Sequence, residues 1–201
     1  MQKILRDDVW DLVQYEKVRD EMRHRLIGLK RWRRVPVGDR LTFLFENRDT
    51  VLFQIQEMIC TERMVKEEKI LEEIETYNDL MPGERELSAT MFIEVDDPGQ
   101  IREVLDRLKG IDQGSTVALH IGGRFEAPGI FEGGRSNEEK ISAVHFVKFA
   151  FSELARQAFL DLKLPVDLVV DHSRYKERTK IEGDTRWSLI EDLANYSYPS
   201  L

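Results

Sequence analysis

Polar side chains crowd into the stretch from Glu46 to Glu62, where a predicted strand passes into a predicted helix. Free backbone N–H groups at a helix start attract anions, and such junctions often hold binding sites. Gln54 and Glu57 share a helix face because they are three residues apart, whereas Gln56 lies about 200° around the helix from Gln54. The candidate binding surface here comprises Glu46, Asn47, Arg48, Thr50, Gln54 and Glu57. The alternative is structural: Glu46 pairs with the arginine two residues later, and the glutamines satisfy buried backbone groups.

The helix predicted over residues 15–34 carries a second candidate surface at its C-terminal end. From Lys17 to Arg34 the chain has eight lysines and arginines against two acids. The end of this helix supplies Arg31, Trp32, Arg33 and Arg34. A tryptophan among cations can stack on a base while the cations neutralise phosphates. The net charge of −8, with nine acids against four bases from Glu62 to Glu86, argues against nucleic acid. We therefore expect pairing with an acidic protein surface, in this chain or on a partner.

A metal site is the alternative chemistry, with Glu57, Glu62 and His145 as candidate ligands. Carboxylate oxygens and imidazole suit iron, manganese or zinc as the divalent cofactor. The chain lacks the Glu-x-x-His helical pair that is typical of carboxylate-bridged sites. His145 lies in a strand that is apolar on both faces, where an unpaired imidazole would cost about 1–3 kcal/mol, so it must have a partner. That partner is a metal or a structural group.

Other reactive residues fit ordinary structural roles. Asp171, His172 and Ser173 do not form a catalytic triad, because adjacent residues of an extended chain point in opposite directions and no Gly-x-Ser-x-Gly turn is present. The glycine pairs at 122–123 and 133–134 lack the spacing of nucleotide-binding loops. Cys60 lies among apolar neighbours and is expected to be a packed small residue. His24, His120 and His172 are expected to be ordinary core or rim histidines.

Hydrophobic periodicity predicts a single α+β domain over residues 1–201, with a mixed sheet of about six strands and about six helices. The predicted strands are residues 41–46, 86–95, 116–121, 124–127, 141–151 and 166–171. The predicted helices are the basic one at 15–34, one that Asp49 or Thr50 caps, 66–77, one from Pro98 to Gly110, one that Ser152 caps, and a C-terminal one at about 185–196. Residues 128–140 and 175–183 are predicted connections. Strand order is left open.

Composition bounds the class of protein. The 201 residues carry 38 acidic and 30 basic side chains, and the pI is near 5.2. The single cysteine excludes an intramolecular disulfide and fits a reducing compartment. No stretch approaches the roughly 18 apolar residues of a membrane-spanning helix. We therefore expect a cytoplasmic protein without a membrane span.

Several segments, taken in order and spacing, resemble one bacterial family. They are the block from Leu44 to Met58, the basic end from Lys30 to Arg34, the run from Glu72 to Pro82, Leu87 to Thr90, Ser142 to Phe146, and Val170 to His172. Together they resemble domain-of-unknown-function family number 3501 over nearly the whole chain. The resemblance implies a genomic setting beside rubrerythrin-like and iron–sulfur oxidoreductase proteins, and hence a partner of that kind or a pathway shared with them. Where family members tend to carry an acidic run, this chain has residues 127–134, of sequence APGIFEGG.

Two functions follow from these patterns. The first is a cytoplasmic binding or accessory protein of an iron-dependent redox system, acting through the Glu46–Glu57 stretch and the basic helix. The second is a metal-dependent enzyme with a carboxylate and histidine site. Geometry separates them, because metal ligands must place their donor atoms at about 2.0–2.2 Å from one ion. Glu57 and His145 would then have to approach one point.

Overall fold

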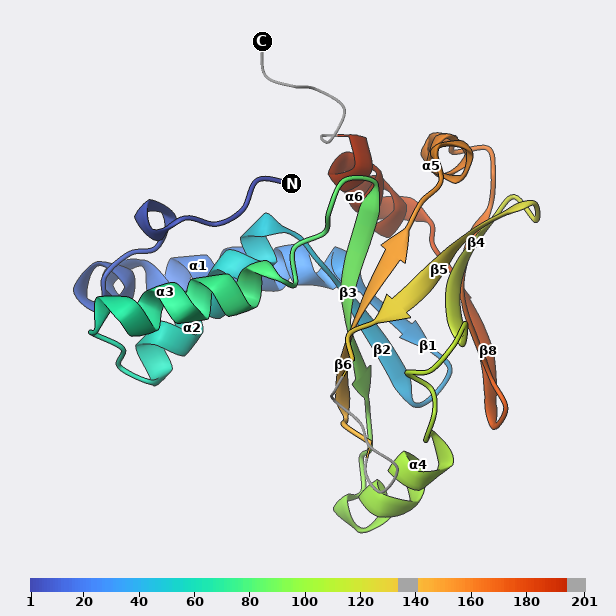
Figure 1. Cartoon of the computed structure of the whole chain (residues 1–201), viewed down its shortest axis with the longest axis horizontal. Helices are drawn as coiled ribbons and strands as arrows, with labels where there is room; N and C mark the ends of the chain where they lie inside the picture. Colours follow the sequence, from blue (N-terminus) through green and yellow to red (C-terminus); the bar gives the residue numbers. More distant parts are fainter. Residues whose placement is uncertain (134–140, 195–201) are drawn as a thin grey trace.

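The computed structural model describes residues 1–133 and 141–194 (Figure 1). Its strands are β1 (Arg34–Val37), β2 (Leu41–Glu46), β3 (Glu86–Ile93), β4 (Val117–Ile121), β5 (Phe125–Phe131), β6 (Val144–Ala150), β7 (Val166–His172) and β8 (Tyr175–Lys180). Its helices are α1 (Leu12–Arg33), α2 (Arg48–Thr61), α3 (Glu67–Asn78), α4 (Ile101–Arg107), α5 (Glu153–Leu160) and α6 (Gly183–Ala194), with short 3₁₀ turns η1 (Arg6–Asp8) and η2 (Pro98–Gln100).

All eight strands form one antiparallel sheet in the order β1-β2-β3-β6-β5-β4-β7-β8. The sheet coils so far that its two edge strands meet. The Thr179 hydroxyl of β8 donates to the Pro36 carbonyl at 2.6 Å, and the Tyr175 hydroxyl donates to the Val37 carbonyl at 2.7 Å. Side chains thus bridge the edges, and the sheet becomes a nearly closed barrel.

The α+β class is confirmed, but the predicted mixed sheet of about six strands is corrected to eight antiparallel strands. The two missed strands are the edges. The sequence pattern predicts the end of a helix and a proline turn where β1 lies, yet proline is tolerated on an edge strand. It predicts a charged connection where β8 lies, although charged side chains are typical of a protected edge. β5 also runs on to Phe131, through the start of the predicted 128–140 loop, the rest of which from 134 lies outside the described residues.

Alternation along the strands fills the barrel. In β2, Phe43 and Phe45 point inward, and in β6 Val147 and Phe149 do the same. The rings of Phe45 and Phe149 pack with centroids 5.8 Å apart. Helices α5 and α6 close one end of the barrel and α4 lies at the other (Figure 1). The outward side chains of the same strands are therefore left to form surfaces.

A second core lies between the helices of the α1–α3 layer, beside the barrel (Figure 1). Val51, Ile55 and Ile59 recur along α2 at helical spacing and are buried against α3. The N-terminal segment is tied to this layer because Asn78 accepts from the Ile4 N–H and donates to the Ile4 carbonyl, both at 2.9 Å. The layer therefore holds α2 beside the outer face of β2.

The helix predictions hold with small shifts. The basic helix predicted at 15–34 is α1, and the helix predicted at 66–77 is α3. The C-terminal helix predicted at 185–196 is α6 as far as Ala194, and the last two residues of that prediction lie outside the described residues. Within the described residues, no helix is both long enough and apolar enough to cross a membrane.

Candidate functional site

Glu46 ends β2 on the outer face of the sheet and is only 1 % exposed. Its Oε1 accepts hydrogen bonds from the Thr90 hydroxyl at 2.7 Å and from the Gln54 amide at 3.1 Å. Its Oε2 has no hydrogen-bond partner within the described part of the chain. The expected pairing with Arg48 is not formed, because Arg48 makes its ion pair with Asp8 at 2.6 Å. Glu46 is therefore a buried carboxylate that is only half satisfied.

Asn47 and Thr50 are used by the start of α2 itself. The Asn47 side chain accepts from the Thr50 N–H at 3.0 Å, and the Thr50 hydroxyl accepts from the Asn47 N–H at 2.9 Å. This reciprocal pair is a capping box. The N-cap is thus Asn47, earlier than the Asp49 or Thr50 that we predicted, because its short side chain reaches the third N–H of the helix.

The basic end of α1 divides into a buried and an exposed part. Arg33 is fully buried and donates to the carbonyls of Phe45 and Glu46 at 2.8 and 3.2 Å, to the Ser188 hydroxyl at 2.7 Å, and to the Asp192 carboxylate. Burial raises the pKa of Asp192 and the Arg33 guanidinium opposes that rise. Arg33 therefore belongs to the interior and not to the predicted surface.

The exposed part of this end keeps the cations and the tryptophan that we expected there. The Arg31 guanidinium lies over the Trp32 ring at 5.1 Å, and both side chains are exposed. The Arg34 guanidinium lies over Phe92 of β3 at 5.7 Å. Arg34 therefore packs against the outer face of the sheet, in the same groove as Gln54 and Thr90, which donate to Glu46.

Glu57 faces α1 inside the helical layer. Its carboxylate accepts from Arg19 at 2.8 Å through both oxygens and from the Tyr15 hydroxyl at 2.7 Å. The hydrogen bonds from Arg19 hold the pKa of Glu57 below its usual value, against the opposing effect of burial. Both oxygens of Glu57 are therefore occupied by protein donors.

The fold does not bring the three candidate metal ligands together. His145 points into the barrel, where Nε2 lies 2.7 Å from the Ser142 carbonyl and Nδ1 lies 3.6 Å from the Asp112 carboxylate. Glu57 belongs to the helical layer, and Glu62 is exposed at the end of α2. Across residues 1–133 and 141–194, no group of three or more His, Cys, Asp or Glu residues could hold a metal ion.

A groove of about 560 Å³ lies between the outer face of the sheet and the helical layer. Its floor includes Leu44, Phe92 and Val144 from three adjacent strands. Lys30 and Arg34 line it on the α1 side, and Glu73 and Thr76 line it on the α3 side. Gln54 and Thr90, the two donors to Glu46, also line it. The half-satisfied carboxylate therefore lies directly behind the wall of this groove.

The groove continues along the sheet into a second hollow of about 330 Å³, lined on its far side by Ser88 and Lys148. The two share Asp79, Leu80, Glu132 and Phe146 among their lining residues. Together they form an elongated channel with an apolar floor and charges of both signs along its sides. Such a channel suits an extended segment of another protein better than a compact small molecule.

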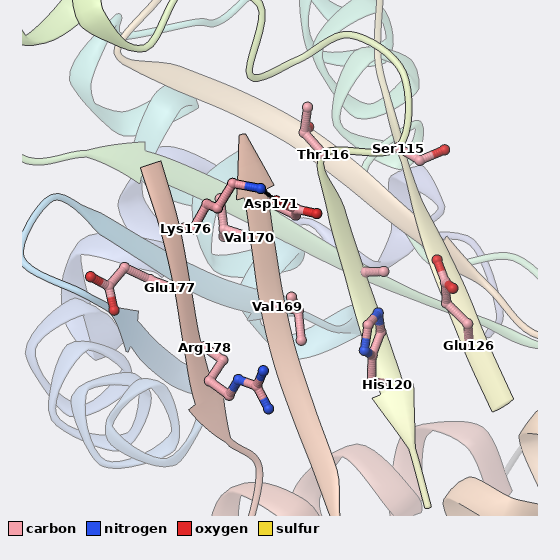
Figure 2. A pocket seen from close by; sticks show the side chains of 11 residues that line it. Ser115, Thr116, His120, Glu126, Val169, Val170, Asp171, Lys176, Glu177 and Arg178 are labelled. Atoms are coloured by element: carbon pink, nitrogen blue, oxygen red, sulfur yellow. Dashed lines mark hydrogen bonds and ion pairs between the residues drawn. The ribbon is translucent and has the colours of Figure 1, made fainter. Parts of the chain in front are cut away.

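Another hollow, of about 730 Å³, is a surface that we did not predict (Figure 2). It lies over the outer faces of β4, β7 and β8, with Ala118 and Val169 as its small-residue floor. Figure 2 shows Val169 on the middle strand, with Arg178 on one side of it and His120 on the other. Lys176 is ion-paired with Asp171 and lowers the pKa of that carboxyl. The missed signal is a cation at every second residue from 176 to 180, which is the period of a strand.

The remaining histidines agree with the structural alternatives. His172 is buried, with Nε2 3.0 Å from the Lys109 carbonyl, while its neighbour Asp171 is exposed. The two side chains therefore point in opposite directions, as expected for adjacent strand residues. Exposed His24 places Nδ1 2.7 Å from the Asp20 carbonyl of its own helix.

These features define a single-domain α+β protein with a barrel-like antiparallel sheet, a helical layer beside it and a groove between the two. Residues 3–193 match the family model described as "Protein of unknown function (DUF3501)". The chain belongs to that family, as the resemblance implied.

One solved structure is similar over the whole fold. It is a "novel protein of unknown function" from Burkholderia pseudomallei K96243, and it is 32% identical to this chain with a TM-score of 0.88. The similarity covers 96% of this chain and 100% of that one. No curated protein matches the chain.

Proposed function

We propose that this chain is a cytoplasmic binding protein that docks onto a partner protein of an iron-dependent redox system. The docking surface is the groove between the sheet and the α1–α3 layer. The occupant is an extended segment of the partner that presents a lysine or arginine to Glu46 beside apolar side chains. This assigns the chain an accessory role.

The observation that carries the proposal is the unsatisfied oxygen of Glu46. A buried carboxylate oxygen without a donor costs about 1–3 kcal/mol, and more when it is charged. Arg33 does not supply that donor, because its guanidinium pairs with Asp192 and donates to backbone carbonyls. A cation from outside the chain would supply the missing hydrogen bond.

Gln54 makes that exchange feasible. Its amide is half-buried, lines the groove and donates to Glu46 Oε1 at 3.1 Å. Rotation of this flexible side chain would open the carboxylate to the groove without moving the backbone of α2. A partner amine or guanidinium would then take over Oε1 from Gln54 and supply the missing donor to Oε2, and charged hydrogen bonds are about twice as strong as neutral ones.

The groove floor supplies the affinity that a single charge cannot. Apolar side chains of three strands lie side by side there, and burying apolar surface contributes about 25 cal/mol per Å². Charges of both signs along the sides fix orientation more than affinity. The nature of the partner rests on the family resemblance, which implies rubrerythrin-like or iron–sulfur oxidoreductase proteins.

The test is a titration of the purified chain with a rubrerythrin-like protein and with an iron–sulfur oxidoreductase from the same genome, followed by calorimetry. We expect one of them to bind saturably. Glu46→Gln keeps a side chain that can pair with Thr90 but removes the charge, and it should weaken binding about tenfold or more, since each 1.4 kcal/mol is tenfold. Glu62→Gln, at an exposed glutamate directly after α2, is the matched control and should bind as the wild type does.

Two results would overturn the proposal. Binding that Glu46→Gln and Glu62→Gln leave equally strong would remove the groove from the interaction. Failure of both redox proteins to bind would remove the assignment of the partner. Circular dichroism of each variant establishes that a loss of binding is not a loss of fold.

A further inference from the structure

The start of α6 is an open helix N-terminus. Gly183 begins this 12-residue helix with a φ of +58°, and a Cβ placed there would meet no atom within 4 Å. The Arg186 N–H is the first to reach back in the helical pattern, to the Glu182 carbonyl at 3.3 Å. The N–H groups before it have no intrahelical acceptor, and the helix dipole adds partial positive charge at this end. This end alone favours an anion but does not define a site.

Arg186 provides the second and independent observation. It is only 4 % exposed, lies over the Phe159 ring at 3.9 Å, and donates through one terminal nitrogen to the Phe159 carbonyl. Its other terminal nitrogen, Nη1, has no hydrogen-bond partner in the described part of the chain. Burial lowers the pKa of Arg186 to about 10, and the Asp161 carboxylate opposes this effect from a distance. A buried guanidinium without a carboxylate partner is costly, because its lost hydration is not replaced.

A cavity of about 270 Å³ joins these two features. Gly183 and Arg186 line it from α6, Lys163 lines it from the segment before β7, and Lys180 lines it from the end of β8. Glu182 is the one acidic residue of its lining. The cavity is smaller than the roughly 300–1,000 Å³ of drug-sized pockets, so its ligand must be small.

We propose that this cavity binds a small phosphate-type oxyanion, either inorganic phosphate or the phosphate group of a small ester. The anion accepts from Arg186 and from the first N–H groups of α6, and the two lysines neutralise its remaining charge. Arginine presents its donors in a fork that matches such oxyanions, and helix N-termini bind them with backbone N–H groups. This site is separate from the groove and does not depend on the proposed docking function.

The test is calorimetric titration of the full chain with inorganic phosphate, and separately with glycerol 3-phosphate, at low ionic strength. We expect saturable binding with one ion per chain. The double variant Lys163→Gln/Lys180→Gln changes only exposed side chains and should weaken binding about tenfold or more, a loss of about 1.4 kcal/mol. Lys176→Gln removes a cation from the same strand but outside the cavity, and it should leave the affinity unchanged.

The two ligands distinguish the source of the anion. Tighter binding of glycerol 3-phosphate would assign the site to an ester, and equal binding would assign it to the phosphate group alone. Arg186→Gln should abolish binding, and the lysine variants keep the test decisive if that variant does not fold. Absence of saturable binding by both ligands, or equal weakening by Lys176→Gln, would overturn the proposal.

Discussion

Arg33, which contacts α6, and Arg186, which belongs to α6, are both buried arginines, but their surroundings differ. Arg33 donates to two carbonyls, a hydroxyl and the Asp192 carboxylate, so its charge and its hydrogen bonds are matched inside the protein. Arg186 has one carbonyl and the face of an aromatic ring, and its Nη1 is left without a partner in the described part of the chain. Arg186 lines a cavity beside a helix N-terminus.

The difference separates a buried arginine that holds elements of the fold together from one that is able to bind a ligand. Arg33 joins α1, β2 and α6 through its partners, and a saturated group of this kind has no capacity left for a ligand. Arg186 and Glu46 each have a buried polar atom without a hydrogen-bond partner in the described part of the chain, one of each sign. Arg186 lines a cavity, and Glu46 lies behind the wall of the groove. Buried polar groups are normally satisfied, so an unsatisfied one beside a cavity is an indication of a site.

The largest effect should come from breaking the saturated pair. Asp192→Ala leaves the Arg33 guanidinium buried without its carboxylate, and removing one partner of a buried pair costs about 3–5 kcal/mol. Urea unfolding at pH 7 measures this loss. Glu191→Ala, which removes the exposed acid next to it, should cost less than about 0.5 kcal/mol. A loss below about 1 kcal/mol for Asp192→Ala would mean that the pair does not hold α1 to α6.

The same substitution at both arginines should have different effects on the free energy of unfolding. Arg33→Met leaves a buried carboxylate and two carbonyls without their donor, and should cost about 3–5 kcal/mol. Arg186→Met leaves only the Phe159 carbonyl and also removes the cost of burying a charge, so we expect a loss of about 1 kcal/mol. The measurement is urea unfolding in phosphate-free buffer. Equal losses would show that Arg186 is as well compensated as Arg33.

Regular elements with strong periodicity could be predicted from the sequence. The helices at 15–34 and 66–77 and the strands at 41–46 and 166–171 are close to their observed bounds, because their apolar residues repeat with the period of the element. The two edge strands could not be predicted in this way, because β1 contains a proline and β8 is charged. Their pairing across the barrel opening is a long-range property that no local pattern records.

The candidate site was only partly predictable for the same reason. Glu46 and Gln54 stand out as polar residues at a strand–helix junction, and they do lie together. Arg33 looks like the cations around it, and only its contacts with Asp192, some 160 positions later, place it inside. Arg186 lies in an ordinary amphipathic helix, and its burial depends on Phe159 of another helix. Whether a buried charge has hydrogen-bond partners depends on contacts between residues far apart in the chain, and the local sequence does not record those contacts.

The partly exposed ion pair between Arg19 and Glu57 should contribute less to the free energy of unfolding than the buried arginines do. Arg19 holds the pKa of Glu57 below its ordinary value of 4.5, so the folded state favours the ionised carboxylate. The stability that this supplies is fully present above the ordinary pKa and is lost as the pH falls through the lowered one. Wild-type protein should therefore lose more stability between pH 7 and pH 3.5 than Glu57→Gln does, as measured by urea unfolding at each pH. The effect should be smaller than that of either arginine substitution, because solvent screens this pair.

The control is Glu62→Gln, at the exposed end of the same helix, and its stability should follow that of the wild type at each pH. Identical pH dependence of the wild type and Glu57→Gln would show that the ion pair adds nothing to folding.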